Sequence, residues 1–300
     1  MAIYVNTNVS SLTGRNSLNN VQNSLTTTYQ RLSTGMRINS AKDDAAGLQI
    51  ADRLTTQING LNQGNRNASD GIAFAQTAEG AMDEISSMLQ KIRTLAVQSA
   101  TGTNTSDDRA AINKEAASLV NEITRIAQQT TYGGKTILNG GDKGVKSMYS
   151  NSKASAGQLK LQVGANSGDQ ITFDVANFKF SKLLDHTGIT ASSGWTANNK
   201  NLNLSTASGA SDVIRIMDAM IKTTDAQRAD LGAIQNRLES SIRNQSNIAT
   251  NESDARSRIR DADFAEESAN LSQQSIIQQA AASMLMQANT RPQLALSLLG

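Results

Sequence analysis

Few residues in this 300-residue chain have the types and spacing that could support catalysis or cofactor binding. The single histidine is His186, and the absence of cysteine excludes disulfides, thiolate nucleophiles and thiolate metal sites. With one imidazole, no Ser-His-Asp set stands out, and a surface position explains His186 better than a role as catalytic base. The residue inventory therefore favours a protein that is not an enzyme.

Two short motifs imitate ligand-binding loops. Residues 134–136 (Gly-Lys-Thr) resemble the end of a phosphate-binding loop, but Gln129 stands where that motif needs its first glycine. Asp261 and Asp263 resemble the opening of a calcium loop, but the residues that follow lack the required Asp or Asn and the glycine. The sequence therefore predicts neither a cofactor nor a metal site.

The charge balance argues against nucleic acid as a partner, because the net charge is only +2 and the signs are mixed. Three arginines cluster between residues 256 and 260, but Asp254, Asp261 and Asp263 flank them, which predicts a salt-bridged helix face. No window offers about 18 consecutive apolar residues, so we expect no membrane insertion. The first residues have no features of a secretory signal, which alone would predict a cytoplasmic protein.

Both ends of the chain are rich in apolar residues but nearly free of charge. Residues 1–30 contain one charged side chain, Arg15, and residues 268–300 contain one, Arg291. The whole chain has 28 basic and 26 acidic side chains, so this depletion is strong. Termini are normally solvated and charged. We therefore expect both ends to be buried against other copies of the protein.

The apolar residues at both ends recur at helical spacing, which gathers them on one stripe of a helix. The N-terminal stripe contains Leu18, Val21, Leu25, Tyr29 and Leu32. The C-terminal stripe runs through Ile277, Ala281, Met284 and Ala288. The residues predicted to form the C-terminal half of an assembly interface are Ile276, Ile277, Met284, Leu285, Leu296 and Leu299. We predict that the two sets pack together.

Long helices account for most of the chain in this interpretation. Aromatic residues are scarce and the single proline is Pro292, so little interrupts a helix. Helices are expected over about 5–33, 44–99, 106–129, 214–255 and 258–298. Residues 159–175 alternate as a β-hairpin, and 177–209 are the least regular part. The predicted fold class is mainly α: a long antiparallel helical bundle or coiled coil from both chain ends, with a small patch containing the β-hairpin.

Six segments resemble bacterial flagellins. They are residues 29–39, 43–50 and 95–99 near the N-terminus, and 231–238, 257–263 and 294–299 near the C-terminus. The likeness covers residues 1–176 and 207–300 in register. It implies a filament-forming structural subunit of the bacterial flagellum that enables swimming, and no enzyme activity.

The resemblance also implies how the chain is divided. Residues 1–43 and 257–300 would form an inner coiled-coil domain lining the filament channel. Residues 44–176 and 207–256 would form an outer helical-bundle domain with the β-hairpin, and 177–206 would be a short variable insert.

Export and partners follow from the same resemblance. It implies secretion in an unfolded form through the flagellar type III apparatus, without a cleaved signal, and a final location in the extracellular filament. The implied partners are other copies of the chain, the export apparatus and its chaperone, the filament cap and the hook–filament junction proteins.

A Toll-like receptor of animals is a further partner that the resemblance implies. The contact would lie at Gln90, Lys91, Arg93 and Leu95, with Glu115 on the next helix. The agonist pattern usually has Arg where Lys91 stands, and Lys keeps the charge but lacks the planar fork. The alternative is that the charged residues form a solvated face between subunits and that Leu95 packs inside the bundle.

Two other functions remain open at this stage. A hook–filament junction protein would share the terminal pattern but would cap a filament without elongating it. A peptidoglycan or protein hydrolase carried in the insert would need a catalytic role for His186.

Overall fold

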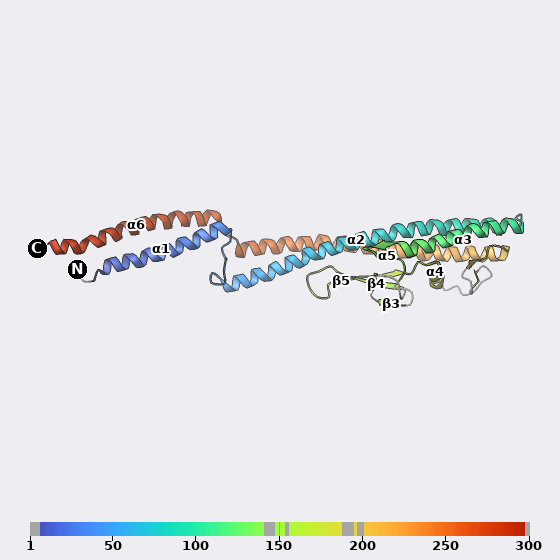
Figure 1. Cartoon of the computed structure of the whole chain (residues 1–300), viewed down its shortest axis with the longest axis horizontal. Coiled ribbons are helices and arrows are strands. Elements are labelled where there is room, and N and C mark those ends of the chain that lie inside the picture. The colour runs from blue at the N-terminus through green and yellow to red at the C-terminus, as the bar shows by residue number, and fades with distance from the viewer. Residues whose placement is uncertain are drawn as a thin grey trace. The chain divides into compact units, whose positions relative to one another are not determined.

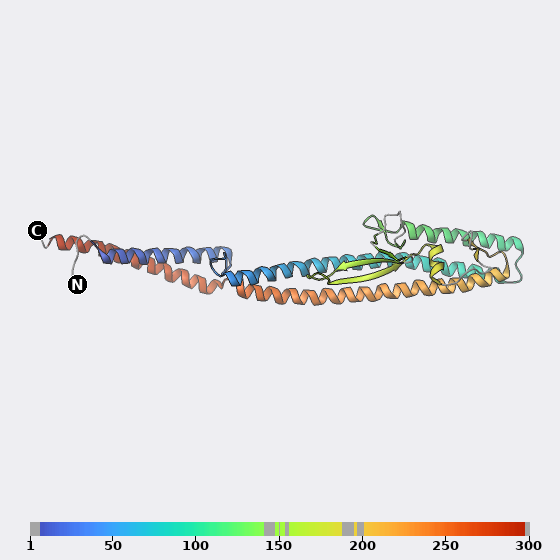
Figure 2. The ribbon, with the colours of Figure 1, turned by 90° about the horizontal axis from the view of Figure 1, so that it is seen from below.

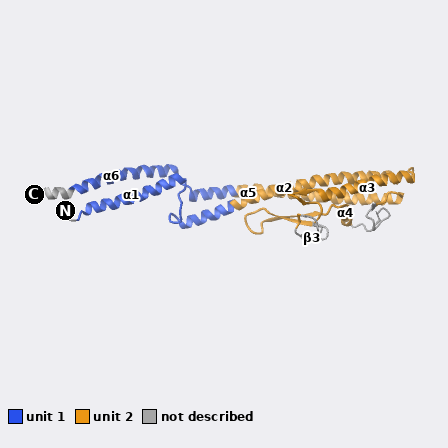
Figure 3. Ribbon diagram, viewed as in Figure 1, with its two compact units in different colours: residues 1–58, 249–300 blue, residues 59–248 orange. Residues whose placement is uncertain are grey.

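The computed structural model describes residues 7–140, 148–149, 151–153, 156–187, 195–196 and 201–297. The chain forms two compact units (Figure 3). Unit 1 contains residues 1–58 and 249–300, and unit 2 contains residues 59–248. The long helices in chain order are α1 (Val9–Thr34), α2 (Ala45–Ala100), α3 (Ser106–Gln129), α5 (Ala207–Arg260) and α6 (Phe264–Ser297).

These helices confirm the mainly α prediction. The bounds of α2 and α3 agree with the expected ranges to within a residue, whereas α5 begins at Ala207, earlier than expected. The three-part division at residues 43 and 256 stays a prediction. No helix in the described part of the chain has the length and apolar character needed to cross a membrane.

Unit 2 is built around a continuous apolar core. The parts of α2 and α5 that belong to it lie beside α3 (Figures 1 and 2), and their buried side chains follow the spacing of a helix face. On α2 this buried face includes Met82, Ile85, Leu89, Ile92 and Ala96, all fully buried. Such a helix face is stabilised mainly by tertiary packing.

The predicted β-hairpin is confirmed as β4 (Ala156–Gln162) and β5 (Gln170–Ala176), paired antiparallel; β3 (Asn151–Lys153) pairs with β4 on its other edge. The hairpin lies along α2 within unit 2 (Figure 2). A Cβ at Gly64 would stand 2.0 Å from the carbonyl oxygen of Val163, and one at Gly71 would stand 2.2 Å from Leu161 Cδ1. Each helical glycine costs about 1 kcal/mol relative to Ala. Here that cost allows the hairpin to approach the helix closely.

A second, smaller hairpin explains the motif that imitates a phosphate-binding loop. Strands β1 (Thr131–Tyr132) and β2 (Lys135–Thr136) pair antiparallel. Gly133 and Gly134 connect them with φ of 56° and 77°. Two-residue turns of this kind need positive φ at both central positions, which glycine adopts without strain. The glycines therefore serve the turn.

The stretch 177–209, expected to be the least regular part, contains regular elements. Residues Phe180–Thr187 form the helix α4, with Phe180, Leu183 and Leu184 buried in the core. His186 lies half-buried in its last turn. Two short strands follow, β6 (Trp195–Thr196) and β7 (Asn201–Leu202), paired antiparallel. Residues 188–194 and 197–200 lie outside the described residues.

Candidate assembly interface

Helix α1 has clear chemical boundaries at both ends. The Asn8 side chain caps its start by accepting a hydrogen bond from the Ser11 N–H at 3.1 Å. At the other end Gly35 adopts φ of 69°, and its N–H donates to the Arg31 carbonyl at 2.8 Å. A glycine in the left-handed conformation is a common helix stop. The predicted end of the helix near Gly35 is therefore confirmed.

The links that follow α1 and precede α6 are joined through the backbone. The Arg37 N–H donates to the Arg260 carbonyl at 2.7 Å, and the Ala262 N–H donates to the Gly35 carbonyl at 3.0 Å. Asp263 then caps α6 by accepting from the Ala265 N–H at 2.8 Å. Asp263 therefore has a structural role as a helix cap.

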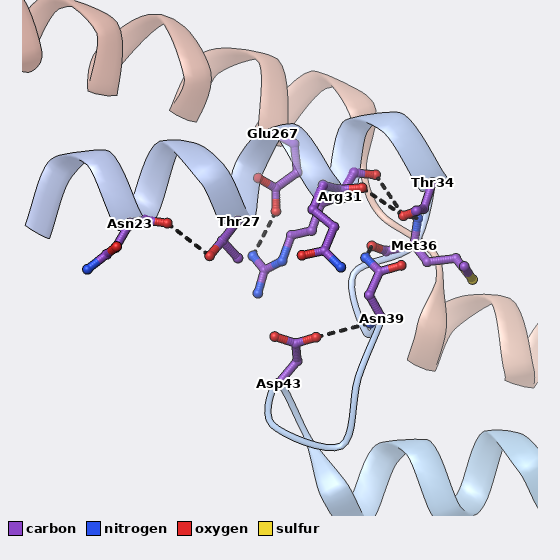
Figure 4. Close-up of polar contacts among 9 residues, drawn as sticks. Asn23, Thr27, Arg31, Thr34, Met36, Asn39, Asp43 and Glu267 are labelled. Carbon is purple, nitrogen blue, oxygen red and sulfur yellow. Dashed lines mark hydrogen bonds and ion pairs between the residues drawn. The ribbon is translucent and has the colours of Figure 1, made fainter.

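The turn that follows α1 is held by a carboxylate (Figure 4). Asp43 Oδ2 accepts hydrogen bonds from the Ser40 N–H at 2.9 Å, the Ser40 hydroxyl at 3.0 Å and the Asn39 N–H at 3.2 Å. These donors stabilise the ionised form, the Ser40 N–H most of all, and so lower the pKa of Asp43. The turn is thus fixed by local polar contacts.

Helices α1 and α6 pack side by side, antiparallel, as Figures 1 and 2 both show. The facing residues alternate in steps of three and four, which is the heptad pattern of a coiled coil. We call these residues the seam. On α1 the seam contains Ser11, Gly14, Leu18, Val21, Leu25, Thr28 and Leu32. On α6 it contains Glu267, Leu271, Gln274, Gln278, Ala281, Leu285 and Ala288.

Small and polar residues make up much of the seam, and several of them make contacts across it. A Cβ at Gly14 would stand 3.2 Å from Leu285 Cδ1, which shows that Leu285 lies over the glycine. Nearby, the Asn8 side chain donates to the Ala288 carbonyl at 2.8 Å, and the Ser11 hydroxyl donates to Asn289 at 2.8 Å. These contacts are made in the antiparallel alignment that the structure shows.

An ion pair closes the opposite end of the seam (Figure 4). Arg31 Nη1 donates to Glu267 Oε1 at 2.9 Å. The Glu267 side chain is 8% exposed and that of Arg31 is 31% exposed. A buried carboxylate needs such a partner, because an isolated charge away from water is very costly.

Most large apolar side chains of these two helices lie outside the seam and are exposed. The extremes are Met284 at 72% and Ile276 at 67%. We call the set the outer apolar residues. They are Val9, Leu12, Tyr29, Phe264, Ile276, Ile277, Met284 and Met286.

Four of the five residues of the predicted N-terminal stripe lie on the seam. Leu25 is buried on the seam, and Leu18, Val21 and Leu32 are half-buried there. Tyr29 is 59% exposed and lies off the seam, and its place in the assembly interface stays a prediction. Strict heptad steps select Thr28 instead, and Thr28 is buried.

The predicted C-terminal stripe is displaced around the helix. Leu285, Ala281 and Ala288 lie on the seam, but Ile276, Ile277 and Met284 are exposed. Helix α1 of the same chain therefore does not cover these three side chains. The side chain of Leu296 and the whole of Leu299 lie outside the described residues.

The residues predicted for receptor contact lie in unit 2, where both cations are paired. Lys91 forms an ion pair with Glu115 at 3.4 Å, and Arg93 forms one with Asp218 at 2.5 Å. Gln90 is exposed on the same part of α2, whereas Leu95 is 8% exposed and belongs to the core. Leu95 therefore packs inside the helical bundle, as the alternative to receptor contact predicts.

The arginine cluster near residue 258 has the predicted salt-bridged character. Arg258 pairs with Asp254 on the next turn of α5 at 2.9 Å. Both side chains are exposed, at 78% and 61%. This pair belongs to a solvated helix face.

The fold and its seam define a class of protein: a helical subunit whose two chain ends pair and expose apolar faces. The sequence matches two families over most of its length. Residues 5–143 match the bacterial flagellin N-terminal helical region, and residues 214–299 match the bacterial flagellin C-terminal helical region. Flagellin A of Vibrio cholerae is 37% identical over the whole of both chains, and polar flagellin C of Vibrio parahaemolyticus is 36% identical, again over the whole of both. The chain belongs to the bacterial flagellins.

Membership of this family gives the general function of the chain. Like its relatives, the chain is a structural subunit of the extracellular flagellar filament and not an enzyme. The crystal structure of Bacillus cereus flagellin covers 60% of this chain and 88% of its own, at 25% identity and a TM-score of 0.45. A protein described as flagellar hook-associated, from Vibrio parahaemolyticus, covers 73% of this chain and all of its own, at 16% identity and a TM-score of 0.56. That likeness concerns the fold alone.

Proposed function

We propose that the outer apolar residues of α1 and α6 form the surface through which copies of the chain polymerise. The observation that carries the proposal is their exposure on two helices that have almost no charge. An exposed apolar set of this kind marks an interaction surface in a soluble protein. Other copies are the occupant that fits, because the chain is a filament subunit.

Charge depletion suits this role for a simple physical reason. Apolar area removed from water contributes about 25 cal/mol per Å², whereas a buried unpaired charge costs far more than one side chain gains. A helix that must be covered on several faces can therefore carry apolar and neutral polar residues, but few charges. Contacts that join different faces of successive copies generate a helical polymer when their rotation does not close a ring.

The finer architecture of the filament belongs to the same proposal. We propose that residues 1–43 and 257–300 line its inner channel, with 44–176 and 207–256 outside them and 177–206 as a variable insert. Export in an unfolded form through the type III apparatus, with a chaperone, is compatible with a seam of small and polar residues. The filament cap and the junction proteins would contact the same terminal helices.

Recognition by a Toll-like receptor is a separate part of the proposal. Gln90, Lys91, Arg93 and Glu115 would supply the contact, while Leu95 supports the surface from the core. Because Lys91 and Arg93 are already paired and exposed, a receptor would replace existing weak ion pairs. A reporter-cell assay comparing the wild type with Arg93→Ala tests this; an unchanged response would contradict it.

One experiment tests polymerisation itself. Purified full-length chain is mixed with short filament seeds or brought to a salting-out concentration, and the product is imaged by electron microscopy. The proposal predicts long helical filaments that grow from the seeds. Seeds that are capped but never elongate would support the hook–filament junction alternative, whose fold is similar.

A further inference from the structure

The Arg31–Glu267 ion pair has a special position in the sequence. Arg31 is the first charged residue after Arg15, and Glu267 is the last one before Arg291. Each therefore stands at the border of a long neutral segment. In the fold these two border charges meet, although 236 positions separate them in the chain.

The seam alone does not select one alignment of α1 and α6. Its pattern repeats every seven residues, so a displacement of one helix by one heptad would again bring seam residues together. Half of the seam consists of small or neutral polar side chains, which tolerate several partners. Contacts that are specific to one position must therefore supply the choice.

The two border charges select the alignment of α1 and α6, because the neutral segments offer them no other partner. If Arg31 moved along α6 by one heptad towards the C-terminus, it would face the neutral Gln274, and Glu267 would lie beyond the end of α1 at Thr34. A displacement in the other direction would bring Glu267 opposite the neutral Ser24 and carry Arg31 beyond the start of α6 at Phe264. Charge depletion thus makes this pair the one available between the two segments.

Burial makes the loss of the pair costly. The Glu267 side chain is 8% exposed, and Glu267 Oε2 and Arg31 Nε are also buried with no hydrogen-bond partner among the described residues. The buried Glu267 carboxylate therefore depends on one hydrogen bond, and separating the pair would leave it without compensation, whereas Arg31 is 31% exposed and is also attracted by Asp43. At the other end of the seam, Leu285 lies over Gly14 in the same alignment.

We infer that the Arg31–Glu267 ion pair sets the axial register of α1 against α6. A slip of one heptad would move the outer apolar residues of one helix by about 10 Å relative to those of the other. The two helices would then no longer present one surface to a neighbouring copy. The effect of the register on assembly rests on the proposed function. Arg31 and Glu267 act as positioning residues.

Cysteine cross-linking can read the register, because the chain has no cysteine of its own. The double variant S11C/N289C reports the native register, since these two side chains are already in hydrogen-bond contact at 2.8 Å. The variants S11C/A282C and L18C/N289C report displacements by one heptad in the two directions. Full-length chains are seeded into filaments and oxidised, and intrachain cross-links are measured under non-reducing conditions.

Three charge variants are placed in each reporter background. In E267Q, we expect the ratio of native to displaced cross-link to fall by at least about tenfold, because Arg31 loses its partner. The charge-exchanged R31E/E267R should restore the native cross-link. The matched control is D254N, which removes the exposed Arg258–Asp254 pair of the same 2.9 Å length and should leave the ratio unchanged.

The outcomes separate the inference from the proposed function. An unchanged ratio in E267Q would overturn the inference, and so would a charge-exchanged chain that fails to recover the native cross-link. If the S11C/N289C chain with the natural charges forms no filaments, the proposed function itself fails.

Discussion

The two units of the chain use apolar residues in opposite ways. Unit 2 buries them in a continuous core that runs through α2, α3, α5 and the β-hairpin. Unit 1 pairs α1 with α6 through a seam half of which is small or neutral polar, and it leaves eight large apolar side chains of these helices exposed. Of eleven large apolar side chains exposed among the described residues, nine belong to unit 1. We therefore expect unit 2 to be stable as a folded body, whereas the proposed function has other copies cover unit 1.

Removing most of α6 should have the largest effect. We expect the chain without residues 268–300 to be soluble and unable to polymerise, because half of the proposed interface is absent. Its unit 2 should still melt near the wild-type temperature. Sedimentation after seeding and thermal unfolding by circular dichroism measure the two properties. Normal filaments from this chain would contradict the proposed difference between unit 1 and unit 2.

Matched substitutions in the two units should affect different measurements. Leu89→Ala in unit 2 should lower the free energy of unfolding by about 2–5 kcal/mol, because Leu89 is fully buried. Met284→Ala in unit 1 should change it by less than about 0.5 kcal/mol, because the side chain is 72% exposed. It should instead raise the critical concentration for polymerisation. Urea unfolding and sedimentation separate the two, and an equal loss of stability in both variants would contradict this account.

Two glycines of α2 test how closely unit 2 is packed. Gly64→Ala should lower the free energy of unfolding by about 1–3 kcal/mol, because its Cβ would stand 2.0 Å from the Val163 carbonyl oxygen. Gly80→Ala should raise it by about 1 kcal/mol, because nothing lies within 4 Å of that Cβ. Urea unfolding of both variants gives the comparison. Equal values for the two would mean that the hairpin does not depend on Gly64.

The smallest effect is expected for the exposed ion pair of unit 2. The Lys91 and Glu115 side chains are 59% and 50% exposed, so Lys91→Ala should change the free energy of unfolding by less than about 1 kcal/mol. Added salt should reduce this difference further. The same measurement on Arg31→Met, whose partner Glu267 is buried, should show the larger loss. Equal losses would remove the distinction between these pairs.

The sequence was sufficient for the helices and insufficient for the way they face one another. Apolar steps of three and four located α2 and α3 to within a residue. They did not decide between Thr28 and Tyr29, because neutral helices with apolar residues on several sides have more than one plausible stripe. Helix α4 was missed because eight residues are too few for a clear periodic signal. The Arg31–Glu267 pair had a usable signal, since both residues border the neutral segments.

Oxidation of methionines in free chains and in filaments tests the central claim most directly. Met284 and Met286 are 72% and 66% exposed, while Met82, Met217 and Met220 in unit 2 are fully buried and serve as internal controls. Peroxide oxidation followed by peptide mass spectrometry gives a rate for each residue. The account predicts that Met284 and Met286 are oxidised rapidly in free chains and at least about tenfold more slowly in filaments, with the controls slow in both. Equal rates for Met284 and Met286 in the two states would contradict the claim that other copies cover this face.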